Sequence, residues 1–146
     1  MKFLNFLFPV LMVMGCTSGK QVYESNCNEE QAFKKISYSH LIDSLSQYDQ
    51  QYIEIVGRYV EGKQLSVLYN DSTLLNNNNT ALWINFSQDC PLYLSGTQKG
   101  FFDYTNGEFS QFKNKKVRIR GKVDTHNHGP LKHYRACIDR VSLIEM

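Results

Sequence analysis

The sequence has little that carries catalytic chemistry. It lacks a Gly-x-Ser-x-Gly turn, a phosphate-binding loop, a Cys-x-x-Cys pair and paired carboxylates around a glycine-rich turn. Such motifs hold nucleophiles, phosphate-binding amides, redox-active thiols or acid–base pairs in place. Their absence from the sequence predicts that the protein is not an enzyme.

Strong charge of one sign is also lacking. Sixteen basic and 14 acidic side chains give a formal net charge of +2. A domain that binds nucleic acid through its surface charge is usually strongly basic, so this balance argues against nucleic acid as a partner. Aromatic residues are plentiful at 13%, and alternating apolar and polar stretches favour a mainly β structure over a helical bundle.

The apolar runs are too short to cross a bilayer, which takes about 20 residues. The longest, Phe3–Met14, follows Lys2 and is interrupted by Asn5 and Pro9. A basic start and an apolar core of about 7–15 residues are typical of an export signal. The alternative is a buried N-terminal helix, which the central proline and the abrupt polar sequence after Cys16 disfavour.

The end of this segment, Val13-Met14-Gly15-Cys16, resembles the lipobox of bacterial lipoproteins. The resemblance implies cleavage before Cys16 and acylation of its thiol and its amine, with palmitate among the acyl chains. Several acyl chains anchor a protein stably, whereas one chain binds only marginally. Because Thr17 and not aspartate follows the cysteine, the resemblance also implies a location in the outer membrane of the cell envelope.

We therefore expect three segments along the chain. They are a signal peptide over residues 1–15, the lipidated Cys16 with a flexible tether over 16–32, and one folded domain over 33–146. The tether is expected because residues 17–30 are polar and have no periodicity. The 131 residues left after cleavage suffice for one domain with its own core.

Four cysteines are present: Cys16, Cys27, Cys90 and Cys137. If Cys16 is lipidated, the other three allow at most one disulfide outside the cytosol, and spacing leaves all three pairings open. Cys27 and Cys90 lie in loop-like sequence, which favours their pairing. Cys137 lies in a strand pattern, where we expect it to be a small packing residue.

Apolar periodicity predicts one short helix followed by five strands. The helix carries Ile36, Leu41, Ile42 and Leu45. The strands are expected as two in residues 51–71 joined at Glu61-Gly62-Lys63, then one in 80–87, one around 117–123 and one over 134–144. Residues 88–114 lack a sustained period and form a long insertion, in which we expect a short helix or a small hairpin.

Gly57 and Gly121 interrupt two of these strands and predict sharp bends that let a sheet curl. Five strands, two of them bent at glycine, resemble the OB-fold over roughly residues 50–146. The resemblance implies a five-stranded antiparallel barrel with one N-terminal helix and a long insertion before the fourth strand; another small barrel or a sandwich is the alternative. The chain is also similar to small envelope lipoproteins with OB-like domains, whose activity is uncharacterised.

Three histidines surround Gly129-Pro130 in the stretch "DTHNHGPLKHYRAC". If these two residues form a two-residue hairpin turn, His126 faces His133 with Cβ atoms about 5 Å apart, and His128 shares their face. Such a cluster would bind zinc or copper through three imidazoles and leave a fourth position open. The alternative is a polar hairpin tip that binds no metal.

A candidate binding surface combines Tyr69, Trp83, Arg118 and Arg120. Rigid aromatic side chains dominate contact energy, so an exposed Tyr or Trp would mark the site for an envelope protein, peptide or glycan. The alternative is a solvated basic strand face that is balanced by Glu54 and Glu61 on a neighbouring strand.

The sequence thus predicts a membrane-anchored, exported lipoprotein with a non-catalytic binding domain and no cofactor. The alternative is a metal-binding protein that uses His126, His128 and His133.

Overall fold

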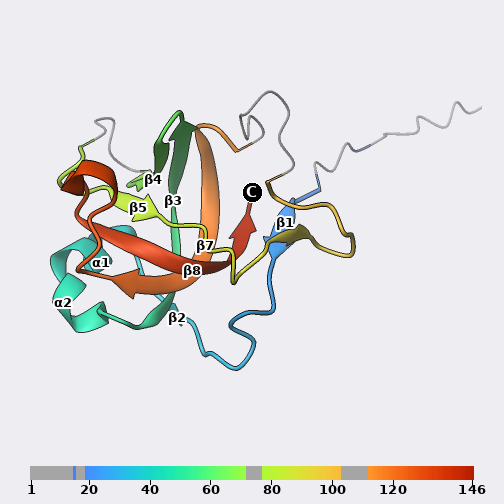
Figure 1. Ribbon diagram of the computed structural model, residues 1–146, viewed down its shortest axis with the longest axis horizontal. Coiled ribbons are helices and arrows are strands. Elements are labelled where there is room, and N and C mark those ends of the chain that lie inside the picture. Colours follow the sequence, from blue (N-terminus) through green and yellow to red (C-terminus); the bar gives the residue numbers. More distant parts are fainter. Residues whose placement is uncertain (1–14, 16–18, 72–76, 103–111) are drawn as a thin grey trace, which may run out of the picture.

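Five strands of the computed structural model close into a barrel (Figure 1). They are β3 (Tyr52–Gly62), β4 (Leu65–Tyr69), β5 (Leu82–Ile84), β7 (Lys115–Asp124) and β8 (Ala136–Glu145). The structure describes residues 15, 19–71, 77–102 and 112–146. Around the barrel the order is β3-β4-β5-β8-β7, and β7 pairs again with β3.

The predicted OB-like fold class is confirmed, although the barrel is mixed and not purely antiparallel. β5 runs parallel to β8, and the other neighbours in the barrel are antiparallel. A closed ring with an odd number of strands cannot alternate direction all the way round, so one parallel pair is unavoidable.

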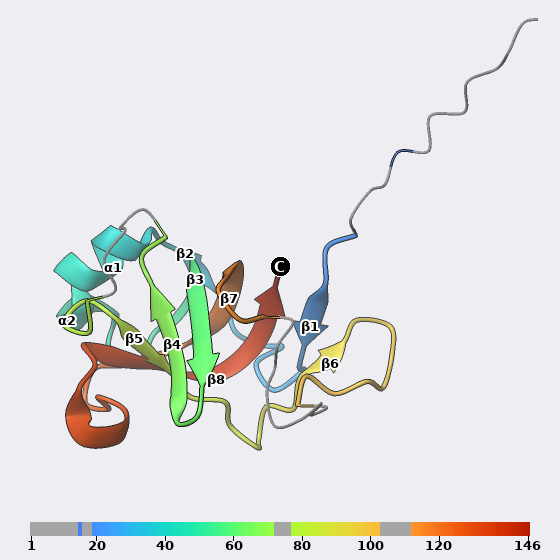
Figure 2. The same ribbon diagram turned by 90° about the horizontal axis from the view of Figure 1, so that it is seen from above.

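Shorter elements surround the barrel (Figure 2). They are β1 (Val22–Glu24), β2 (Lys34–Lys35), β6 (Tyr93–Leu94), the helices α1 (Tyr38–Asp43) and α2 (Leu45–Tyr48), and a 3₁₀ turn at Pro130–Lys132. β1 pairs with β8 and with β6, whereas β2 pairs in parallel with β3.

The single helix expected around residues 36–45 is two short helices. The Ser37 hydroxyl caps α1 by accepting from the His40 N–H, and the helix ends at Ser44. α2 then begins at Leu45, and buried side chains of both helices join the barrel core. Within the described ranges, no helix has the length and apolar character to cross a bilayer.

The barrel curls where glycine lets two strands approach closely. A Cβ on Gly57 would lie 2.7 Å from the Leu68 Cγ and 2.7 Å from the Tyr69 carbonyl oxygen. A Cβ on Gly121 would lie 2.6 Å from the Ile138 Cγ2, at the point where the β7–β8 register shifts. These two glycines therefore permit the bends that the sequence predicted.

Alternate residues of the strands fill the barrel. The main core is a continuous cluster of fully buried side chains, of which the largest are Tyr23, Tyr59, Phe101, Phe112, Leu41, Ile53, Ile55, Leu68, Leu82, Ile84, Leu92 and Ile119. A second, small cluster of Val67, Tyr69 and Ala81 packs against Trp83 and Tyr134. Tyr134 comes from the segment that joins β7 to β8, so this segment covers part of the outside of the barrel.

The expectation of a flexible tether over residues 16–32 is wrong for most of its length. β1 pairs with the C-terminal half of β8, and the Tyr23 ring packs edge-on against Phe101 and Phe112 at 5.3 Å. Because β5 covers only the first residues of that β8 edge, the rest is open for β1. A strand of three residues is too short to show an alternation of apolar and polar side chains, so the sequence did not indicate β1.

A disulfide joins Cys27 to Cys90, the pair that the sequence favoured. It links the segment after β1 to the insertion before β7. In the described part of the insertion, Tyr93 bridges to Gly100, and the Phe101 N–H donates to the Leu92 carbonyl. This is the small hairpin that we expected there, and it carries β6 onto the outer edge of β1.

We expect Gly57→Ala to lower the free energy of unfolding by about 1–3 kcal/mol, because its methyl group would overlap Leu68 and the Tyr69 carbonyl. Gly62→Ala is the matched control on the same strand, since its nearest neighbour would be the Leu65 Cβ at an ordinary 3.7 Å. Denaturant unfolding of both variants measures the difference. Equal stabilities would contradict the role given to Gly57.

Candidate functional site

A cleft of about 380 Å³ lies beside the β3–β4 hairpin and the end of β5. Its walls combine aromatic rings with polar side chains at the rim. The lining residues are Tyr59, Glu61, Gly62, Lys63, Gln64, Leu65, Ser66, Trp83, Ile84, Asn85, Phe86, Phe102 and Lys113. Small-molecule sites commonly have volumes of about 300–1,000 Å³, so this cleft is large enough to hold a ligand group.

The aromatic wall is held rigidly by ring packing. The centroid of the Phe86 ring lies 5.2 Å from that of Phe102 and 6.2 Å from that of Tyr59, and both pairs are edge-on. The Ser66 hydroxyl donates to the Ile84 carbonyl at 2.9 Å and contacts the Tyr59 hydroxyl at 3.2 Å. These contacts fix the rings before any ligand arrives, which lowers the entropy lost on binding.

The polar side chains that line the cleft differ in their exposure to solvent. Glu61 is buried, whereas Lys63 and Gln64 are more exposed on the turn of the hairpin. The side chain of Asn85 is oriented by the 3.1 Å hydrogen bond that its amide donates to the Asp139 carboxylate. The site therefore offers apolar ring faces together with hydrogen-bonding groups, which suits a ligand that has both characters.

The four residues of the predicted binding surface have two kinds of surroundings: Trp83 packs against the small cluster that holds Tyr69, whereas the two arginines bond to carboxylates. Trp83 lines the cleft, but Tyr69 is buried in the small second cluster, where its hydroxyl donates to the Asn78 side-chain oxygen. Arg118 and Arg120 lie on β7, bonded to carboxylates. Tyr69 is therefore too buried to mark an exposed surface, because alternation assigns a face of a strand but not the direction in which a curled barrel turns it.

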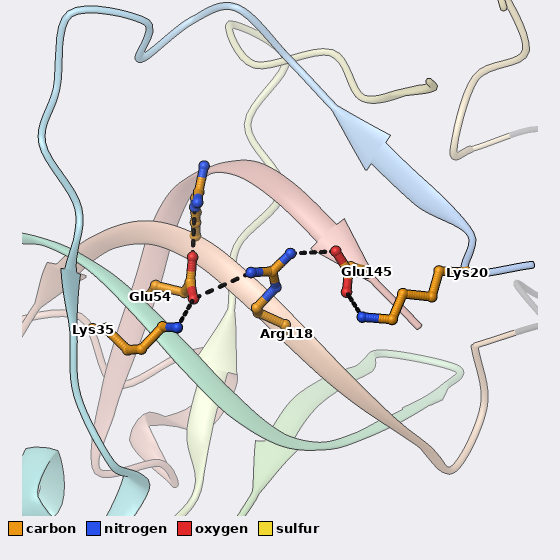
Figure 3. A network of polar contacts seen from close by, with 6 residues as sticks. Lys20, Lys35, Glu54, Arg118 and Glu145 are labelled. Carbon is orange, nitrogen blue, oxygen red and sulfur yellow. Dashed lines mark hydrogen bonds and ion pairs between the residues drawn. The ribbon is translucent and has the colours of Figure 1, made fainter. Parts of the chain in front are cut away.

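The two arginines belong to an ion-pair network around Glu54 and Glu145 (Figure 3). Glu54 accepts a hydrogen bond from Arg120 Nε at 2.7 Å and one from Arg118 Nη1 at 3.4 Å. Arg118 also bonds to Glu145, which pairs with Lys20 at 3.1 Å. The basic strand face is thus balanced by Glu54, one of the two carboxylates named in the alternative interpretation of the sequence; the other, Glu61, lines the cleft, and Glu145 is the second acceptor in the network.

Strand register builds this network. Glu54 of β3 stands opposite Arg120 of β7, and Arg118 stands opposite Glu145 of β8. Burial alone would raise the pKa of Glu54, but the Arg120 hydrogen bond and the nearby positive charges outweigh it, so that pKa is lowered. The pKa of Glu145 is lowered as well, first by its hydrogen bond from Arg118 and then by that from Lys20.

The predicted hairpin that would bring the three histidines together is wrong. β7 ends at Asp124 and β8 begins at Ala136, with Asp124 opposite Cys137, so a wide loop replaces the two-residue turn. Within this loop Leu131 and Lys132 both have positive φ, in the 3₁₀ turn at Pro130–Lys132. The cross-strand register on which the three-imidazole cluster depended is therefore absent from this part of the structure.

Each histidine of the predicted cluster has its own surroundings. His126 is exposed, and its Nδ1 lies 3.7 Å from the Asp49 carboxylate and 4.0 Å from that of Asp124. His128 Nδ1 makes a 3.0 Å hydrogen bond with the Tyr134 carbonyl, whereas His133 is exposed.

The carboxylates near His126 hold the loop in place. Asp49 accepts from the Thr125 N–H, and Asp124 accepts from the backbone of His126 and Asn127. The backbone hydrogen bond from Thr125 is the main reason that the pKa of Asp49 is lowered. One potential ligand atom from each of Asp49, Asp124 and His126 lies within 4.8 Å of the others. The hydrogen bonds that the two carboxylates accept from Thr125, His126 and Asn127 all come from the backbone of this loop, so the contribution seen here is to anchor it.

The loop also supports the cleft through Trp83. The Tyr134 ring packs on Trp83 with centroids 5.4 Å apart. Gly129 has φ +67°, and a Cβ there would lie 2.7 Å from Tyr134 and 2.9 Å from Trp83. Trp83 therefore stands between the loop and the cleft, and the glycine that suggested a hairpin turn is needed to let the loop approach it.

Cys137 is the buried packing residue that the sequence suggested. It is free, and burial is the main cause that raises the pKa of its thiol to about 12. The thiol therefore stays protonated at neutral pH. Cys16, the expected lipidation site, lies outside the described residues.

Sequence reasoning missed most of the cleft. The sequence placed Phe86 on a strand but did not predict that it lines a cleft. Phe102 lies in the insertion, where the sequence shows no apolar periodicity. The adjacent pair Phe101-Phe102 was the available signal, since two neighbouring phenylalanines in an otherwise polar segment need apolar partners.

We expect Glu54→Gln to lower the free energy of unfolding at pH 7 by roughly 2 kcal/mol, because the bonds to a charged acceptor are lost. Since the pKa of Glu54 is lowered from 4.5, its contribution is present above that pH and disappears as the pH falls further. Denaturant unfolding at several pH values should show the two proteins converging in acid. Lys35→Ala, which removes an exposed partner, is the control and should change stability by less than about 0.5 kcal/mol.

Comparison with known proteins finds no family model, no curated sequence and no solved structure that matches this chain significantly.

Proposed function

We propose that the protein is a lipid-anchored binding protein of the bacterial cell envelope, whose barrel holds a peptide or glycan ligand in the cleft beside the β3–β4 hairpin. The observation that carries the proposal is the aromatic lining of this cleft by Trp83, Phe86 and Phe102 beneath a polar rim. Flat aromatic faces contact the apolar faces of sugars and peptide side chains, and the polar rim groups orient such ligands.

The preorganised rings favour binding over a loose surface contact. Trp83 is fixed by Tyr134, and Phe86 is fixed by Phe101 and Phe102. Rigid aromatic residues lose little entropy when they are covered, and they often dominate binding energy. Lys63 and Lys113 at the rim supply hydrogen-bond donors for carbonyl, hydroxyl or carboxylate oxygens of the ligand.

The anchor is supported by the sequence alone. Lys2, the apolar run that follows and the small Gly15 before Cys16 fit an export signal that ends at a lipobox. In such an arrangement Cys16 becomes the first residue of the mature protein, and its acyl chains hold the barrel at a membrane.

For the anchor, we expect mass spectrometry of the membrane form to find Cys16 as the N-terminal residue, carrying acyl mass. Cys16→Ala should leave an unprocessed precursor, because the modified thiol is missing, whereas Thr17→Ala is the control and should still be processed and acylated. A mature N-terminus at another residue, without acyl mass on Cys16, would refute the proposed anchor. It would not affect the proposal that the cleft binds a ligand.

For the cleft, Trp83 is the sole tryptophan of the chain, so intrinsic fluorescence reports on the site. The mature chain in detergent is titrated with soluble peptidoglycan fragments and, separately, with short peptides from envelope proteins. We expect one of the two classes to shift the emission saturably, and Phe102→Ala to weaken that binding about 10-fold, from the loss of one central aromatic contact.

Leu131→Ala is the control for the cleft, since this side chain is also apolar, is 82% exposed and belongs to the β7–β8 loop. It should leave the affinity unchanged. The absence of a saturable shift with both ligand classes, or an equal loss in the two variants, would refute binding in the cleft.

A further inference from the structure

We propose that the outer face of β1 and of the β6 hairpin lies against the headgroup region of the membrane that holds the Cys16 lipid, with Tyr93 inserted into that region. The inference rests on the proposed lipid anchor. It adds an orientation: one end of the barrel is in contact with the bilayer, and the opposite end points away from it.

The first step is the short length of chain between the lipid and the fold. Val22 is the first residue of β1, and Lys20 already pairs with Glu145. From Cys16 to Val22 there are six residue steps, which span at most about 20 Å when the chain is fully extended. The docking of β1 on β8 removes the flexible tether that would otherwise hold the domain far from the membrane.

The second step is the position of β1 and β6 in the molecule. β6 pairs with β1, the strand in which the chain first joins the sheet. Figures 1 and 2 both place β1 at one end of the molecule and the loop between β7 and β8 at the other. A membrane close to β1 is therefore reached first by β1 and the β6 hairpin.

The third step is the chemistry of this face. Tyr93 is 44% exposed and shares a shallow hollow with Lys99 and Phe102, which is 38% exposed. A tyrosine ring with a polar tip suits the membrane–water interface, and a lysine can keep its ammonium group in the headgroup layer while its stem lies on apolar surface. Two of the four large apolar side chains exposed in the described ranges therefore lie on the face nearest to the anchor.

The charge of this face is mixed. Glu24 stands opposite Tyr93 in the β1–β6 pair and accepts a hydrogen bond from the Ser95 hydroxyl. The face thus carries one acidic side chain, Glu24, as well as the basic Lys99, so the proposed contact does not depend on anionic lipids. Phe102 also lines the cleft, so in this orientation the Phe102 side of the cleft lies towards the membrane, whereas its Trp83 side packs on the loop between β7 and β8.

The test uses the mature, acylated chain bound to phosphatidylcholine vesicles with and without bromine on the acyl chains, because bromine quenches tryptophan by contact. Tyr93→Trp adds a reporter on the proposed face, and Leu131→Trp adds one in the loop between β7 and β8, which lies at the opposite end of the molecule. The wild-type chain supplies the signal of Trp83, which is subtracted. Both substituted side chains are exposed, so folding should be kept.

We expect brominated lipid to reduce the added emission of Tyr93→Trp by roughly twofold or more, since interfacial side chains reach the boundary of the acyl chains. The added emission of Leu131→Trp should not change. Equal quenching of the two reporters, or none, would overturn the proposed orientation even when mass spectrometry finds the lipid on Cys16. A lack of acyl mass on Cys16 would instead overturn the anchor, and the orientation with it.

Discussion

The pairing of β8 on both of its edges is the constraint on which the structure depends. β7 pairs along one edge, while β5 and β1 share the other. This arrangement closes the barrel and draws the N-terminal segment onto it. Closure also requires β3 and β7 to curl, and the two strands can do so because Gly57 and Gly121 have no side chain where Leu68 and Ile138 approach.

The cleft is a consequence of this closure. β5 ends at Ile84, and the chain leaves the barrel through Phe86 towards an insertion that returns Phe101 and Phe102 to the same place. The Cys27–Cys90 disulfide and the packing of Tyr23 on Phe101 tie this insertion to β1. The wall of the candidate site and the N-terminal segment are therefore stabilised together, which links the ligand-binding end of the molecule to its proposed membrane contact.

Charge contributes to the fold more than to the candidate site. Arg118 and Arg120 bond to Glu54 and Glu145 across three neighbouring strands, and both carboxylates have lowered pKa values as a result. Burying Glu54 among arginines favours one strand register over its neighbours, since a slip by one residue would turn the charges to opposite faces of the sheet. The residues at the rim of the cleft remain outside this network in the described part of the chain.

The sequence by itself determined the mainly β class, the strands around Ile55 and Ile119, the bends at Gly57 and Gly121 and the packing role of Cys137, because alternation and backbone freedom are local properties. The expected lipid anchor at Cys16 also comes from local sequence. Only the tertiary structure decided the parallel pair, the docking of β1 and the cleft between β5 and the insertion. It also dispersed His126, His128 and His133, because a loop in place of a tight turn removed their shared register. The alternation of apolar and polar residues indicates on which face of its own strand a side chain lies. A site depends in addition on which strands become neighbours when the barrel closes.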